Sequence, residues 1–153
     1  MNLFFFLILC AIFFDFALNN FARFLDLHKI SKHLPDEFIN HYDEEKYALS
    51  QQYTSTNIYH DFISSTTSFI FIIVIISSNF FNTLDVWLRG FGFSSIITGL
   101  LFFAVFVLIT DFMSIPFSIY QTFIIEKKYG FNKTTPRTFI IDKIKSYCIL
   151  LIF

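Results

Sequence analysis

The sequence predicts an all-α fold, a multi-span helical membrane protein with three complete transmembrane helices and a truncated fourth. Of its 153 residues, 55% are hydrophobic and 22% are aromatic. Only 15% are charged, whereas soluble domains average about 25%. A hydrocarbon core about 30 Å thick needs about 20 apolar residues in a helix, and three segments meet that need. The length suits a single domain.

The three complete spans are predicted at residues 3–22, 62–81 and 93–112. The first begins with an apolar run and is interrupted by Asp15. It lacks the preceding basic residues and the following A-x-A site of a secretory signal peptide, so we expect a retained helix. A fourth apolar run starts near Tyr147 and ends with the sequence after seven residues. We therefore expect a fourth span that is cut off.

Basic residues stay on the cytoplasmic side of membrane proteins, which predicts the orientation. The connection between the first two spans and the segment after the third hold ten of the eleven Lys and Arg residues, and Arg89 stands alone between the second and third spans. The N-terminus is therefore expected outside and both long polar segments inside. In a bacterial cell this would be the inner membrane. Trp87, in the single outer connection, suits an interfacial anchor, and Gly90 and Gly92 suit a turn.

The first cytoplasmic segment contains a helix-start signal at Pro35, with acidic residues directly after it. The acidic cluster Asp43-Glu44-Glu45 lacks a cation-loop pattern and is interpreted as a solvated helix face. The acidic residues Asp15 and Asp111 are expected at the membrane boundary, where a charge costs less than at a helix centre. A functional role facing a wet interior is the alternative for these two acids.

The second cytoplasmic segment has clearer local signals. The stretch after Pro116 is expected to form a partly buried or interfacial helix, ending near Gly130, which can adopt a positive φ. Thr135 can cap the next helix, with Pro136 at its first position. That helix is expected to have one apolar face, made of Phe139, Ile140, Ile144 and Cys148.

No catalytic, cofactor-binding or metal-ligating residue is predicted in this chain. The four histidines, His28, His33, His41 and His60, do not form an H-E-x-x-H motif. Cys10 and Cys148 lie in apolar runs and suggest neither a disulfide nor a metal site. The net charge of -1 argues against nucleic-acid binding.

One string nevertheless resembles a known family. Ile115-Pro116-Phe117-Ser118-Ile119-Tyr120-Gln121-Thr122-Phe123-Ile124-Ile125-Glu126, followed by Tyr129-Gly130-Phe131-Asn132-Lys133-Thr134-Thr135-Pro136, is similar to the N-terminal membrane region of CAAX prenyl proteases of the Ste24 type. The earlier Leu34-Pro35-Asp36-Glu37-Phe38 looks like the first cytoplasmic loop of that family. The resemblance runs from about Asn20 to the end of the sequence, with departures at Leu49 and Lys127.

The resemblance implies that residues 1–153 are the N-terminal transmembrane domain of a zinc metalloendopeptidase, with the catalytic domain absent. The parent enzyme would use zinc to cleave prenylated CAAX substrates or membrane proteins, and this chain would contribute chamber wall. Its implied partners are the lipid bilayer, the missing downstream part of the protease, and protein or peptide substrates. The chain lacks H-E-x-x-H, so we do not expect it to be active alone.

Two other classes of function remain open. The first is a non-catalytic integral membrane protein, a helical shell that binds lipid or a partner helix. The second is a small transporter or channel component, suggested by Asp15, Asp111 and the hydroxyl-rich stretch 64–68, although small polar residues in spans usually serve helix packing.

Overall fold

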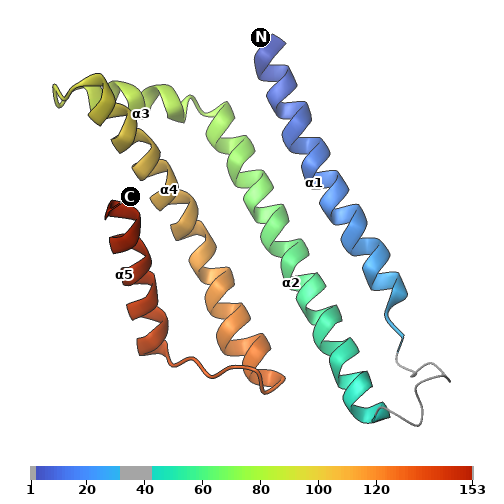
Figure 1. Cartoon of the computed structure of the whole chain (residues 1–153). Coiled ribbons are helices and arrows are strands. Elements are labelled where there is room, and N and C mark those ends of the chain that lie inside the picture. The colour runs from blue at the N-terminus through green and yellow to red at the C-terminus, as the bar shows by residue number, and fades with distance from the viewer. Residues whose placement is uncertain (1–2, 32–42, 153) are drawn as a thin grey trace.

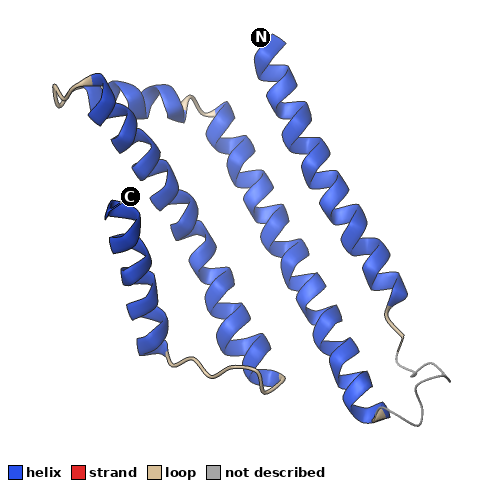
Figure 2. Ribbon diagram, in the orientation of Figure 1, coloured by secondary structure: helices blue, strands red, loops and turns tan. Residues whose placement is uncertain are grey.

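The computed structural model describes residues 3–31 and 43–152, which form helices joined by short connections (Figures 1 and 2). The helices in chain order are α1 (Leu3–Lys29), α2 (Glu44–Ser77), α3 (Phe80–Arg89), α4 (Ser95–Tyr120), the π-helical segment η2 (Gln121–Glu126) and α5 (Pro136–Ile152). The described ranges contain no strand. The all-α class is therefore confirmed. The signal at Pro35 and the similarity at 34–38 lie outside the described residues.

Three helices are long and apolar enough to cross a membrane: Leu3–Lys29, Glu44–Ser77 and Ser95–Glu126. They correspond to the three spans expected from the sequence, but each is longer than its apolar segment. α2 begins at Glu44 because Asp43 caps it, accepting hydrogen bonds from the backbone N–H groups of Glu45 and Lys46. One carboxylate of the acidic cluster is thus used to start a helix.

The connection after α2 is itself helical, which the sequence pattern did not indicate. α2 ends at Ser77, and Phe80 and Phe81 belong to the short helix α3. Asn79 makes the break with a left-handed φ of 59°, a conformation that Asn tolerates better than most residues. Leu84 and Leu88 of α3 are buried, whereas Trp87 is exposed, as expected of an interfacial anchor. Gly92, with a φ of 72°, supplies the predicted turn into α4.

The stretch after Pro116 is helical, as expected, and it continues the helix of the third span without a break. α4 continues through Pro116 to Tyr120 and passes directly into η2. Proline removes one backbone donor inside a helix, yet membrane helices tolerate it because neighbouring polar groups compensate. The hydroxyl groups on either side bond to other carbonyls, Ser114 Oγ to Asp111 O at 2.7 Å and Ser118 Oγ to Ser114 O at 3.1 Å, and not to that of Phe112, four residues before the proline.

The signals around the start of α5 are confirmed. Gly130 has a φ of 79°, and the next N–H, that of Phe131, donates back to the carbonyl of Glu126 at 2.8 Å. This is the kind of bond that closes helix C-termini. α5 then begins at Pro136, and the Thr135 hydroxyl accepts a hydrogen bond from the N–H of Thr138 at 3.2 Å.

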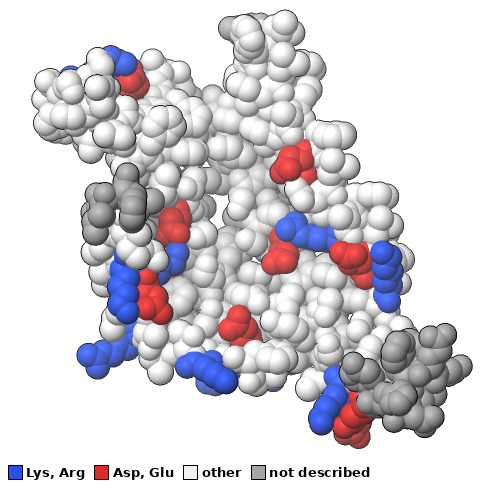
Figure 3. Space-filling view, in the orientation of Figure 1, with Lys and Arg blue, Asp and Glu red and all other residues white. Residues whose placement is uncertain are grey.

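Few described residues are buried between the helices, and most apolar side chains lie on the outer surface. α1 lies beside α2, where the rings of Phe16 and Phe69 stack at 4.3 Å. The few buried residues of the described chain include Ile75 in α2 and Ile125 in η2. Figure 3 shows most charged side chains on the half away from the N-terminus, apart from a basic and an acidic group together at the α3 end. Such an arrangement suits helices whose outer faces contact lipid.

The inward face of α5 differs from the one expected. Phe139, Lys143 and Tyr147, spaced by four, are the partly buried positions, whereas Ile140, Ile144 and Cys148 are exposed. Phe139 contacts Phe123 edge-on, with ring centroids 5.7 Å apart. Lys143 and Tyr147 turn inward because both donate hydrogen bonds to the carboxylate of Asp111 in α4.

Candidate functional site

A partly polar groove lies between the membrane-crossing helices α1, α2 and α4. Its volume is about 390 Å³. Its polar lining comes from all three helices: Asp15, Asn19, Asn20, Arg23, Ser65, Ser68 and Thr110. The rest is apolar: Ile12, Phe16, Phe69, Phe71, Ile72 and Met113. Polar and ionisable residues inside membrane helices usually face a bundle interior or a wet cavity, which makes this groove the candidate site.

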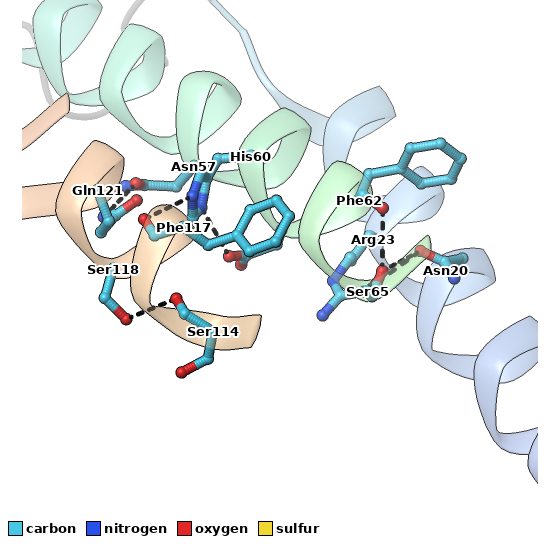
Figure 4. Close-up of polar contacts among 11 residues, drawn as sticks. Asn20, Arg23, Asn57, His60, Phe62, Ser65, Ser114, Phe117, Ser118 and Gln121 are labelled. Atoms are coloured by element: carbon cyan, nitrogen blue, oxygen red, sulfur yellow. Dashed lines mark hydrogen bonds and ion pairs between the residues drawn. The ribbon is translucent and has the colours of Figure 1, made fainter. Parts of the chain in front are cut away.

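Arg23 is the central polar group of the groove. Its Nη1 donates to Ser65 Oγ of α2 at 2.9 Å and to Asn20 Oδ1 at 3.2 Å, and Ser65 Oγ donates to Asn20 Oδ1 at 3.2 Å (Figure 4). The guanidinium therefore joins α1 to α2 through neutral side chains. Within the described residues, no carboxylate forms an ion pair with it.

Asp15 lies in the same groove but away from Arg23. The two residues are eight apart on α1, which corresponds to about 12 Å along the helix axis. Asp15 therefore does not neutralise Arg23. The spacing of four between Asp15, Asn19 and Arg23 places all three on one face of the helix. That spacing is visible in the sequence. From the sequence alone, Arg23 is used only as one of the basic residues that predict the orientation in the membrane.

A second polar contact joins α2 to the end of α4. Gln121 Nε2 donates to Asn57 Oδ1 at 2.8 Å, and His60 Nε2 lies 3.1 Å from the carbonyl oxygen of Phe117 (Figure 4). The His60 ring stacks parallel to Tyr120, and its Nδ1 lies 3.6 Å from Asp61 Oδ1. These contacts fix His60 as a connecting residue between two helices, beside a mostly apolar cavity of about 390 Å³.

Asp111 links α4 to α5. Its carboxylate accepts a hydrogen bond from Lys143 Nζ at 2.6 Å and another from the hydroxyl of Tyr147. The side chains of Asp111 and Lys143 are about a quarter exposed, 26% and 28%. Of the two acids singled out in the sequence, Asp111 therefore has a cationic partner on a neighbouring helix, while Asp15 lines the groove.

The described side chains do not fit a catalytic zinc. No three His, Cys, Asp or Glu side chains in residues 3–31 and 43–152 come together as a metal site would require. His60 is engaged with Phe117, and His28 lies 2.9 Å from its own helix at the carbonyl of Phe24. His33 and His41 lie outside the described residues. No step of metal chemistry is therefore derived from this chain.

Comparison with known proteins identifies relatives of the whole arrangement. A family model described as CAAX prenyl protease N-terminal, five membrane helices, matches residues 24–153. The Schizosaccharomyces pombe protein named Probable CAAX prenyl protease 1 is 33% identical over 124 residues, which are 72% of this chain and 26% of that protein. The CAAX prenyl protease 1 homolog of Dictyostelium discoideum is 30% identical over 146 residues, 92% of this chain and 34% of its own length.

A solved structure has the same fold. The crystal structure of S. mikatae Ste24p superposes with a TM-score of 0.88, covering 97% of this chain and 36% of that chain, at 22% identity. The chain thus spans about a quarter to a third of the length of the curated relatives it matches. Because the family model covers most of the sequence, this chain belongs to the CAAX prenyl protease family and corresponds to its N-terminal membrane portion.

Proposed function

We propose that this chain supplies part of the membrane-embedded wall and substrate access of a zinc metalloendopeptidase that acts on CAAX-box or membrane proteins. The observation that carries the proposal is the family match over residues 24–153, combined with a polar groove inside the membrane helices. Zinc and the catalytic residues would belong to the downstream part of the protease. The groove and the α2–α4 contacts would then serve to position helices and not to perform chemistry.

The proposal includes an orientation. Ten of the eleven basic residues lie in the connection after the first span and in the segment after the third. Since basic residues favour the cytoplasmic side, the N-terminus would lie outside and both long segments inside. In a bacterial cell the membrane would be the inner one. The downstream part of the protease and its peptide substrates would meet the chain from the cytoplasmic side.

The experiment compares the purified chain with the chain co-expressed with the downstream part of its S. pombe relative. The readouts are zinc by elemental analysis and cleavage of a prenylated CAAX peptide. We expect the chain alone to bind no zinc and to cleave nothing, and the pair to be active. The matched control is the pair with the Glu of the relative's H-E-x-x-H replaced by Gln, which removes the catalytic base without changing this chain.

Three outcomes would count against the proposal. Cleavage by the chain alone would place the catalytic centre here. A stable complex with zinc bound but no activity, when the intact relative is active in the same assay, would contradict the wall function. A chain that folds in detergent and never associates with the downstream part would favour the non-catalytic helical shell.

A further inference from the structure

Arg23 is a cation at the end of a membrane-crossing helix without an anionic partner among the described residues. Counted from Leu3, where α1 begins, it lies about 30 Å along the helix at about 1.5 Å per residue. That distance matches the thickness of the hydrocarbon core. Arg23 therefore lies at the level of the lipid headgroups if α1 enters the bilayer at its first residues.

The guanidinium is held in place but not neutralised. Only its Nη1 makes hydrogen bonds to the described protein, and both acceptors, Ser65 Oγ and Asn20 Oδ1, are neutral. Arginine has five N–H donors in a planar fork that suits phosphate oxygens. The donors on Nε and Nη2 are thus available to a ligand. Because Ser65 and Asn20 fix the orientation of the group, little side-chain entropy would be lost on binding.

One strip of the groove suits a chain of methylene groups. Above Arg23, toward the N-terminal end of α1, the lining is Phe16 and Ile12 of α1 and Phe69 and Ile72 of α2. These apolar side chains share the groove with Asp15, Asn19, Ser68 and Thr110. An apolar strip with a cation at one end matches an amphiphile with an anionic head better than a free anion. Basic pockets between membrane helices are known to bind anionic lipid headgroups.

We propose that the groove between α1 and α2 is a binding site for an anionic phospholipid, with the phosphate at Arg23 and an acyl chain along Phe16 and Phe69. The bound lipid would add to the contacts that already join α1 to α2 at Ser65 and at Phe16 and Phe69. This site does not depend on the proteolytic function, because it requires only that α1 and α2 lie in a bilayer.

The test is native mass spectrometry of the purified chain in detergent with added dioleoylphosphatidylglycerol or dioleoylphosphatidylcholine. We expect the anionic lipid to be retained about fivefold better than the zwitterionic one, the preference that one basic residue gives an anionic surface. Arg23→Gln should remove this preference, and Arg23→Lys should keep most of it. Arg89→Gln is the matched control, since Arg89 lies in α3 and pairs with Asp85 at 2.7 Å.

Two further variants separate the parts of the site. Ile12→Trp, which fills the apolar end and leaves Arg23 in place, should also lower retention of the anionic lipid. It serves as the independent test if Arg23→Gln loses its helical circular dichroism. Asp15→Asn removes the other charge in the groove and should retain the lipid at least as well as the original chain.

The proposal is overturned if Arg23→Gln folds and keeps the preference for the anionic lipid, or if both lipids bind equally to the original chain. It is also overturned if Arg89→Gln removes the preference as well, because the effect would then be one of net charge. Displacement of the lipid by an excess of inorganic phosphate would show a free-anion site and would contradict the assignment to a phospholipid.

Discussion

Asp111 of α4 and Lys143 of α5 form an ion pair across two helices, with Oδ1 and Nζ 2.6 Å apart. Tyr147 donates a second hydrogen bond to the same carboxylate. Apart from this pair and the contact of Phe139 with Phe123, the described structure offers α5 few contacts with the other helices. The position of α5 therefore depends on one carboxylate.

Asp111→Asn is expected to lower the free energy of unfolding and to release α5 from α4. Removing one partner of a buried pair leaves the other charge uncompensated. Because both side chains are about a quarter exposed, we expect a loss of about 1 to 3 kcal/mol rather than the full buried-pair value. Thermal unfolding in detergent, with spin-label distances between α4 and α5, measures both effects.

The matched control is the exposed pair of Asp142 and Lys145 on the same helix, 3.6 Å apart. Asp142→Asn should change stability by less than about 0.5 kcal/mol, as is usual for surface pairs. The double variant Asp111→Asn with Lys143→Met should recover part of the loss, because neither charge remains. Equal effects of Asp111→Asn and Asp142→Asn would contradict this account of α5.

Tyr129→Phe is expected to loosen the lower part of α2 from the turn after η2. The buried Tyr129 hydroxyl lies 2.8 Å from Thr56 Oγ1 and donates to the carbonyl of Gln52 at 3.2 Å. Losing these bonds removes a link between the two segments, at a cost of about 0.5 to 1.5 kcal/mol. The carbonyl of Gln52 keeps its hydrogen bond from Thr56 Oγ1 at 2.8 Å, so it is not left unpaired. Tyr120→Phe is the control, because no hydrogen bond of the Tyr120 hydroxyl is found in the described chain, and it should be neutral in chemical denaturation. Equal losses for the two variants would place the stabilisation elsewhere.

Replacing Gly130 or Gly99 with alanine should change the stability in opposite directions. Gly130 has a φ of 79°, so Gly130→Ala should destabilise by about 1 kcal/mol through backbone strain. Gly99 lies inside α4, and an added methyl group there would meet no atom within 4 Å. Gly99→Ala should therefore stabilise by about 0.5 to 1 kcal/mol. The melting temperatures of the two variants, measured in one detergent, test both predictions. A shift in the same direction for both variants would contradict them.

Local signals predicted the parts of the fold that depend on neighbouring residues. The stop at Gly130 and the start at Thr135 and Pro136 follow from the backbone chemistry of those residues, so they were correct. The three spans follow from apolar length alone. Apolar length placed the end of the third span near residue 112, whereas α4 continues through Pro116 into η2.

The features that depend on other helices were not predictable from the sequence. The apolar pattern of α5 favoured Ile140, Ile144 and Cys148 as its buried face, but Asp111, 32 residues before Lys143, draws the lysine side inward. Likewise, the spacing of Asp15, Asn19 and Arg23 indicates one polar face, yet nothing in it identifies Ser65 as the partner. Such contacts are set by helix packing, which periodicity does not encode.

The three membrane crossings and their direction underlie the proposed function, and single-cysteine labelling tests them directly. Cysteines replace Lys46, Arg89 or Lys133, one at a time, in a chain with Cys10→Ala and Cys148→Ala, and intact cells are treated with a membrane-impermeant thiol reagent. All three positions are exposed, so access depends on the side of the membrane. The expected result is labelling at position 89 and none at 46 or 133 until the cells are opened. Labelling at 46 and 133 with protection at 89 would contradict the orientation.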